Sequence, residues 1–174
     1  MSPIARVTAL FALMVLVGCA GRGGTLETVS EVDLPRFMGD WYVIAHIPTF
    51  LEDEAYNAVE SYQLDGDRIE TTFTFRNGGF DGEAKRYEPN AIVRDEETNA
   101  VWGMQFIWPF RSDFRIVHLD ENYATTIIGR NARDYVWIMA REPEINDETY
   151  TELVDKVEGM GYDLSELRRV PQRW

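Results

Sequence analysis

Cysteine and histidine are scarce in this sequence. It holds one cysteine, Cys19, and two histidines, His46 and His118, in 174 residues. A single cysteine forms no disulfide within the chain, so the fold must be held by its hydrophobic core. Two histidines on separate segments are a poor zinc site, because zinc takes several nitrogen or sulfur ligands held close together. The sequence therefore predicts no metal site and no cofactor.

Positive charge is also under-represented. The chain has 17 Lys and Arg against 30 Asp and Glu, which gives a net charge of −13 at pH 7. Proteins that bind phosphate backbones need clustered Lys and Arg, so a nucleic-acid partner is disfavoured. The same charge disfavours adhesion to anionic lipid head groups. Any attachment to a membrane must therefore depend on a feature other than the charge of the protein.

No apolar run in the sequence is long enough to span a bilayer as a helix. The run from Val7 to Val17 follows Arg6, and its length is that of the apolar region of a signal peptide. We therefore predict a signal peptide over residues 1–18.

The run ends in Leu16-Val17-Gly18-Cys19, which resembles the bacterial lipobox. In that motif the chain is cut before the cysteine, whose thiol then takes lipid. We expect lipidation at Cys19 and a flexible linker over residues 19–32, rich in glycine and polar residues. Ala20 in place of Asp favours sorting to the outer membrane, with the protein on its periplasmic face. The alternative is a secretory signal that ends in a chance cysteine.

Turn signals recur at short intervals from residue 40 to residue 141, and this pattern indicates an all-β sandwich or barrel. Asp65-Gly66-Asp67 and Asn77-Gly78-Gly79 are two such turns. The predicted strands are 41–47, 57–64, 68–76, 84–93, 100–106, 113–119, 123–129 and 135–141.

Gly39 and Trp41 open the first predicted strand, and Arg141 closes the last. Together they resemble the signature of the lipocalins. Tyr123, preceded by Asn122, resembles the second motif of that family, Thr-Asp-Tyr. The resemblance implies that Gly39, Trp41, Tyr123 and Arg141 meet at the closed base of a barrel, with the guanidinium over the indole. It implies an all-β fold, an eight-stranded up-and-down antiparallel β-barrel, as a domain over residues 33–174.

A helix is predicted after the barrel. Asn146 is a suitable N-cap, and Asp147 and Glu148 place acids in the first turn. Apolar residues follow at helical spacing, at Tyr150, Leu153, Val154, Val157 and Met160. In lipocalins a C-terminal α-helix packs on the outside of the barrel, and we expect the same here.

Side chains alternate along a strand, so Trp41 and Arg141 fix which residues face the inside of the barrel. The inward wall on this phase is aromatic and mostly uncharged, as a lipid ligand requires. The expected ligand-binding residues are Glu60, Tyr62, Phe73, Phe75, Trp102, Met104, Phe106, Phe114, Tyr135 and Trp137. Small inward residues leave room for a ligand, namely Ala45, Thr71, Ala124 and Thr126. The alternative is a barrel filled by its own side chains.

Polar residues on the inward phase are few. We expect Glu60 near the open rim, in water, and the alternative is that it orients a hydroxyl or amine of a ligand. The same alternation turns His118 inward, close to the base, and His46 outward.

The loops expected at the open end carry apolar residues, Phe50, Leu51, Trp108 and Phe110 among them. These side chains either contact a ligand, membrane or partner, or pack together as a lid. Four arginines lie near the same end and are either solvated or close enough to meet a fatty-acid carboxylate: Arg111, Arg115, Arg130 and Arg133.

No catalytic constellation is apparent in the sequence, because the one cysteine is in the lipobox and no serine is expected beside an inward histidine. The favoured function is a membrane-anchored lipocalin that stores or transports a fatty acid or lysophospholipid in the cell envelope, as a monomer or weak dimer. One alternative is an enzyme on a lipocalin-like barrel, of the lipid isomerase or de-epoxidase type. Another is a structural envelope lipoprotein with a filled barrel.

Overall fold

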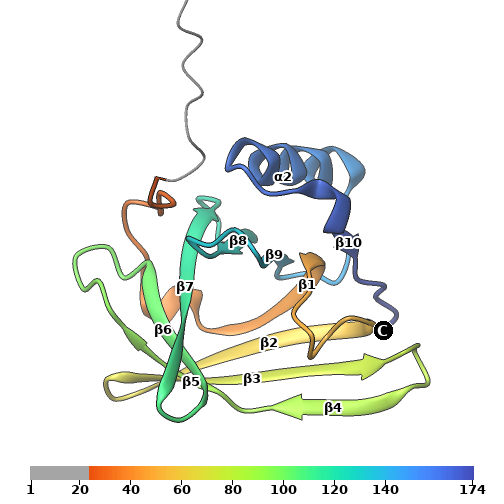
Figure 1. Ribbon diagram of the computed structural model, residues 1–174, viewed down its shortest axis with the longest axis horizontal. Coiled ribbons are helices and arrows are strands. Elements are labelled where there is room, and N and C mark those ends of the chain that lie inside the picture. Colours follow the sequence, from red (N-terminus) through yellow and green to blue (C-terminus); the bar gives the residue numbers. More distant parts are fainter. Residues whose placement is uncertain (1–23) are drawn as a thin grey trace, which may run out of the picture.

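The computed structural model describes residues 24–174 and shows an antiparallel β-barrel with one long helix on its outside (Figure 1). The predicted signal peptide, 1–18, and the predicted lipidation site, Cys19, lie outside the described residues. Pairing of the first barrel strand with the last closes the barrel. The strands are β1 (Gly39–Ile47), β2 (Ala55–Asp65), β3 (Arg68–Asn77), β4 (Glu83–Tyr87), β5 (Asn90–Val93), β6 (Val101–Ile107), β7 (Phe110–Leu119), β8 (Thr125–Gly129), β9 (Val136–Ala140) and β10 (Arg168–Arg169).

The predicted eight-stranded barrel is confirmed, with one interruption. The strand expected over residues 84–93 is divided into β4 and β5, and both segments pair with β3. Pro89 stands at the break, where it has no N–H to donate to a ladder. The two-residue β10 is an additional strand, and it pairs with Ala45 and His46 in the second half of β1.

The predicted C-terminal helix is also confirmed. Helix α2 (Asp147–Gly159) begins at Asn146, whose side chain accepts a hydrogen bond from the amide of Thr149. It lies beside β8 and β9 in Figure 1. Leu153 and Val157 are buried in a cluster with residues of the outer barrel face, which are Ile44, Ala45, Ile47, Ile127, Val136, Ile138 and Ala140. The apolar stripe of the helix therefore covers one wall of the barrel.

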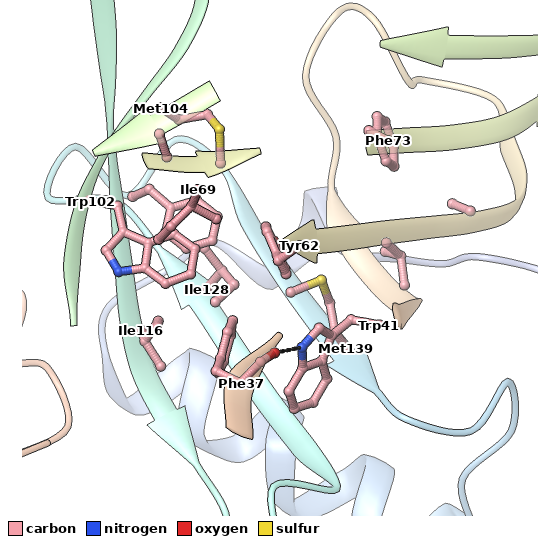
Figure 2. Close-up of a cluster of buried hydrophobic side chains, with 14 of the residues drawn as sticks. Phe37, Trp41, Tyr62, Ile69, Phe73, Trp102, Met104, Ile116, Ile128 and Met139 are labelled. Atoms are coloured by element: carbon pink, nitrogen blue, oxygen red, sulfur yellow. Dashed lines mark hydrogen bonds between the residues drawn. The ribbon is translucent and has the colours of Figure 1, made fainter. Parts of the chain in front are cut away.

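A separate core fills the base of the barrel (Figure 2). It includes a short helix, α1 (Leu34–Phe37), that the sequence analysis did not predict. Phe37 is fully buried and its ring packs against Trp41, Tyr62 and Trp102, with ring centres 5.0, 5.7 and 5.5 Å apart. This helix closes the bottom of the barrel.

The chain before α1 is packed against the barrel, so the prediction of a flexible linker over residues 19–32 is wrong for its second half. Leu26 is 4% exposed and Val32 is 1% exposed. The amide of Val29 donates to the carbonyl of Ile116 at 3.0 Å. Burial of these apolar side chains outweighs the glycine-rich, polar composition around them. In the part of the chain that the structure describes, no helix is long and apolar enough to cross a membrane.

Two β-bulges reverse the alternation that the sequence analysis assumed. In β1 the register with β9 shifts between Val43 and Ala45. A bulge inserts one residue into a strand and turns the following side chains to the opposite face. Ala45 therefore packs under α2, together with Ile47, whereas we expected Ala45 inside the barrel. His46 is paired with the inward-facing Trp137, so it is turned inward rather than outward.

The second bulge lies in β7, between Ile116 and His118. Ile116 belongs to the interior core, but Val117 packs with the cluster under α2. His118 borders the groove between the barrel and α2, together with Leu153 and Lys156. The expectation that His118 faces the interior is therefore wrong, for the same physical reason.

Candidate functional site

The closed base is built around Trp41 and Arg141. The guanidinium carbon of Arg141 lies 3.9 Å from the centre of the Trp41 ring. Its nitrogens donate to carbonyls of the segment that runs into β1, those of Arg36, Phe37, Met38 and Asp40, at 2.8–3.0 Å. The Trp41 indole N–H donates to the carbonyl of Phe37 at 2.9 Å. The cation, the ring and the backbone are thus tied into one unit.

Gly39 and Tyr123 complete this base. Gly39 has a φ of +97°, and a Cβ added there would lie 3.3 Å from Nη1 of Arg141. The hydroxyl of Tyr123 accepts a hydrogen bond from the amide of Asp33 at 2.9 Å, and its ring lies 4.1 Å from the guanidinium of Arg36. The four residues expected at the base therefore do lie there, and they close one end of the barrel.

A cavity of about 280 Å³ opens at the other end. This volume is close to the lower end of the range of roughly 300–1,000 Å³ for small-molecule pockets. The walls are mainly apolar, with a few polar groups. The lining residues are Thr49, Phe50, Leu51, Glu52, Glu60, Phe73, Met104, Phe106, Phe110, Ser112, Asp113, Phe114, Arg130, Tyr135 and Trp137.

Most of the residues that we expected to bind ligand border this cavity. Those that do are Glu60, Phe73, Met104, Phe106, Phe114, Tyr135 and Trp137. Tyr62, Phe75 and Trp102 do not line it. Tyr62 and Trp102 pack on Phe37 at the base, and Phe75 packs against Phe73 and Tyr87. The stacked rings of Trp102 and Phe114, 4.9 Å apart, mark the boundary between the solid base and the cavity.

Two small residues expected to leave room lie elsewhere. Ala124 borders the groove under α2 rather than the cavity. Thr126 is fully buried, and its hydroxyl donates to the carbonyl of His118 at 2.8 Å. Ala124 and Thr126 therefore do not contribute space to the cavity.

We expected Glu60 at the open rim, in water, but the structure buries it beside the cavity. It is 8% exposed and borders the cavity, paired across the sheet with Trp41 and Phe73. Burial raises the pKa of its carboxyl to about 7, and the hydrogen bond from the Tyr62 hydroxyl opposes part of that shift. The charge of Glu52 raises it further. Near neutral pH this side chain is therefore present in both protonation states.

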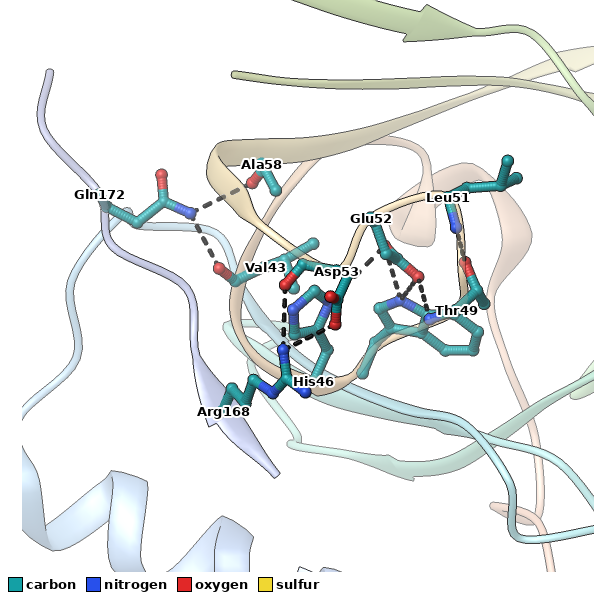
Figure 3. A network of polar contacts seen from close by, with 10 residues as sticks. Val43, His46, Thr49, Leu51, Glu52, Asp53, Ala58, Arg168 and Gln172 are labelled. Carbon is teal, nitrogen blue, oxygen red and sulfur yellow. Dashed lines mark hydrogen bonds and ion pairs between the residues drawn. The ribbon is translucent and has the colours of Figure 1, made fainter. Parts of the chain in front are cut away.

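Glu52 is a cavity residue that the sequence analysis missed. It is 2% exposed, and it accepts hydrogen bonds from the amide of Thr49 at 3.1 Å and from the indole N–H of Trp137 at 3.2 Å. Nδ1 of His46 lies 3.6 Å from its Oε2. Figure 3 shows His46, Thr49 and Glu52 gathered at the loop that follows β1. Loop residues carry no alternation, so no pattern in the sequence marks Glu52 as buried.

The mouth itself is aromatic. Phe50, Trp108 and Phe110 are 85%, 82% and 75% exposed, so they do not pack together as a lid. Arg130 borders the cavity, with Nη1 bound to Asp134 at 3.1 Å. Arg133 is instead held by the carbonyl of Met160, at 2.7 Å.

No group of three or more potential ligand side chains that could hold a metal ion occurs in residues 24–174. The closed base and the open cavity together form a cup with an apolar wall and a few polar side chains, and such a cup can enclose a slender apolar molecule.

Comparison with known proteins places this cup in a family. Residues 32–172 match the model of the lipocalin-like domain. Temperature-induced lipocalin-1 of Arabidopsis thaliana is 31% identical over 84% of this chain and 83% of its own length. The outer membrane lipoprotein Blc of Escherichia coli is 28% identical over 95% of both chains. Among solved structures, insecticyanin of the tobacco hornworm Manduca sexta superposes with a TM-score of 0.65 at 17% identity, over 84% of each chain. Lobster apocrustacyanin A1 superposes with a TM-score of 0.64 at 10% identity, over 86% of this chain and 92% of its own. The chain belongs to the lipocalin family.

Proposed function

We propose that this lipocalin is a lipid-anchored protein of the outer membrane that binds one single-chain lipid, a fatty acid or a lysophospholipid, and stores or carries it in the envelope. The observation that carries this proposal is the open, mainly apolar cavity above a closed base. A barrel filled by its own side chains, as a purely structural protein would have, leaves no such space. We propose binding without turnover.

The anchor and location rest on two independent supports. The Leu16-Val17-Gly18-Cys19 run has the residues of a lipobox. The relatives from Escherichia coli, Vibrio cholerae and Citrobacter freundii are all named as outer membrane lipoproteins. Several acyl chains on one cysteine suffice for stable anchoring, whereas a single chain gives only reversible binding.

The expected affinity follows from the apolar wall. Burying about a dozen methylenes at about 0.8 kcal/mol each contributes up to roughly 10 kcal/mol. Association and ordering of the alkyl chain cost a large share of that free energy, so micromolar binding is expected.

The test is native mass spectrometry of the Cys19→Ser variant, exported without its anchor and isolated without detergent. The proposal predicts a second population heavier by the mass of one single-chain lipid, which organic extraction removes and identifies. A spectrum with the bare protein alone, and no uptake of added lipid, would contradict it.

A further inference from the structure

The deepest layer of the cavity contains a carboxyl group. Glu60 is the lining residue of β2 that lies nearest the base. The next inward residue of the same strand, Tyr62, is 2% exposed and belongs to the core below. Trp102 and Met139, from β6 and β9, are fully buried in that same core. Glu60 therefore stands on the floor of the cavity, and any ligand that fills the cavity reaches it.

One oxygen of this carboxyl has no protein partner. The Tyr62 hydroxyl donates to Oε2 of Glu60. Within residues 24–174, no hydrogen bond or ion pair reaches Oε1. Among the described residues, the side-chain atoms buried without a partner are His46 Nδ1, Thr71 Oγ1 and Arg130 Nε. Oε1 of Glu60 is instead open to the cavity, where a donor brought by a ligand can reach it.

The other carboxylates of the wall are already satisfied. Both oxygens of Glu52 accept from the Trp137 indole N–H, and Oε1 also accepts from the amide of Thr49. Both oxygens of Asp113 accept from Arg115, and Oδ2 also accepts from the amide of Asn131. Glu60 is thus the wall carboxylate, among the residues the structure describes, that has an oxygen reached by no protein donor.

The charges around the cavity disfavour an anion. Glu52 on the loop after β1, Glu60 on β2 and Asp113 on β7 are acids, and Arg130 after β8 is the one cation in the described lining. Arg130 pairs with Asp134 through Nη1 and its Nε has no partner, but the residue follows the mouth end of β8 and lies away from the floor. The Asp113 carboxylate is paired with Arg115. His46 on β1 is turned toward Glu52 rather than toward Glu60. A ligand carboxylate on the floor would therefore meet a carboxyl group with no free cation beside it.

The polarity of the cup runs from an apolar mouth to a polar floor. Phe50, Phe106 and Phe110 border the cavity near its opening and are exposed, while Glu60 is buried at the bottom. An alkyl chain fits the mouth, and a small polar head group fits the floor.

We propose that Glu60 is the head-group site of this cavity, and that the cup prefers a single-chain lipid with a small hydrogen-bond donor, a hydroxyl or an ammonium, over a fatty-acid anion. This inference rests on the proposed lipid-binding function and, of the two ligands named there, disfavours the fatty-acid anion. The head group lies on the floor and donates to Oε1 of Glu60, and the chain extends toward Phe106 and Phe110.

The protonation state of Glu60 separates the two kinds of donor. Its pKa of about 7 means that the carboxyl is largely neutral at pH 6 and largely ionised at pH 8. An ammonium gains a charge partner as Glu60 ionises, so its affinity rises over this interval. A hydroxyl binds both forms and changes less, and a carboxylate is increasingly repelled.

The experiment uses three probes with the same chain length: dodecylamine, 1-dodecanol and dodecanoate. Each is titrated into the Cys19→Ser protein at pH 6 and pH 8, with quenching of tryptophan fluorescence as the readout. We expect the amine to bind at least about tenfold more tightly than the carboxylate at pH 8, a difference of about 1.4 kcal/mol. In Glu60→Gln that ratio should fall to about threefold or less, and the pH dependence of amine binding should disappear.

Glu70→Gln is the matched control. It removes a carboxylate from the exposed face of β3, outside the cavity lining, and leaves Glu60 in place, so the preference for the amine should be retained within about threefold. Thermal unfolding checks that both variants fold. Glu60→Asp keeps the charge, and it should retain a preference for the amine that Glu60→Gln lacks.

The outcomes separate this inference from the proposed function. If none of the three probes binds, lipid binding itself is wrong. If all three bind but the carboxylate equals or exceeds the amine, or if Glu60→Gln leaves the ratio unchanged, the cavity binds lipid and the head-group site is wrong. Binding of all three probes without a preference that depends on Glu60 would place the polar end of the ligand at the mouth.

Discussion

Trp41 lies on the first strand of the barrel and Arg141 directly follows the last, yet the guanidinium carbon of Arg141 lies 3.9 Å from the centre of the Trp41 indole ring. The same guanidinium donates hydrogen bonds to the carbonyls of Arg36 and Phe37 in α1. This contact joins the first strand, the last strand and the helix that closes the base.

The first prediction concerns the coupling of these two residues. Trp41→Ala should cost about 3–5 kcal/mol of unfolding free energy, as a large-to-small change in a packed core. Arg141→Ala should cost about 1–3 kcal/mol, because several carbonyls lose their donor. The double variant should deviate from additivity by about 0.5–3 kcal/mol in denaturant unfolding, since the two side chains touch. Trp174→Ala, at a position 69% exposed, is the control and should change stability by less than about 1 kcal/mol. Strict additivity would show that the cation and the ring do not interact.

The second prediction concerns Gly39. Its φ of +97° is one that residues with a Cβ rarely adopt, and the added methyl would also approach Arg141. Gly39→Ala should therefore lower the unfolding free energy by about 1–3 kcal/mol. Gly159→Ala is the matched control, because a Cβ there meets nothing within 4 Å and no positive φ is required. It should be neutral or stabilising by up to about 1 kcal/mol. Equal melting temperatures for the two variants would refute the strain at Gly39.

The arrangement of the base was predictable from the sequence, and the cavity was predictable only in part. Trp41 and Arg141 mark the first and the last strand of the barrel, because their residue types and spacing form a recognisable pair. Alternation then places Phe73, Met104 and Trp137 on the cavity wall. This reasoning depends on an unbroken strand.

Alternation fails where a strand contains a bulge, since an inserted residue leaves no mark in the hydrophobic pattern. That is why His46 and His118 were each assigned to the wrong face. Glu52 was missed because it lies on a loop, where burial follows from tertiary contacts rather than from periodicity. Helix α1 was missed because its four residues are too few to show a helical period.

The third prediction concerns pH and stability. The pKa of Glu60 is raised from 4.5 to about 7 on folding, so the folded state holds a proton that the unfolded state releases between these values. The contribution of Glu60 to stability is therefore greatest below about pH 4.5 and declines as the pH rises to about 7, by an amount of order 3 kcal/mol. The Gln side chain in Glu60→Gln cannot ionise, so the unfolding free energy of this variant should increase relative to that of the parent from pH 5 to pH 8. Parallel stability curves for the two proteins over this interval would show that Glu60 is not shifted.

The fourth prediction concerns Cys19. The lipobox predicts an acylated protein that stays in membrane pellets, and Cys19→Ser should appear in the soluble fraction or remain unprocessed. Fractionation, gel mobility and the mass of the N-terminal peptide report this change. If the variant fractionates and migrates as the parent does, the protein is not anchored through this residue.

The fifth prediction tests the central claim, that one lipid chain occupies the cavity, and the measurement is a titration with 1-alkanols and fatty acids of increasing chain length. Each added methylene should strengthen binding by up to about 0.8 kcal/mol until the cavity is full, after which the affinity should level off. Ser112→Phe fills part of the cavity wall and should weaken binding and bring the plateau to shorter chains, whereas Ser165→Phe, on the exposed surface, should do neither. A rising series with a plateau that Ser112→Phe shortens is the result we predict. A flat series, or unchanged binding by Ser112→Phe, would show that the lipid does not lie in the cavity.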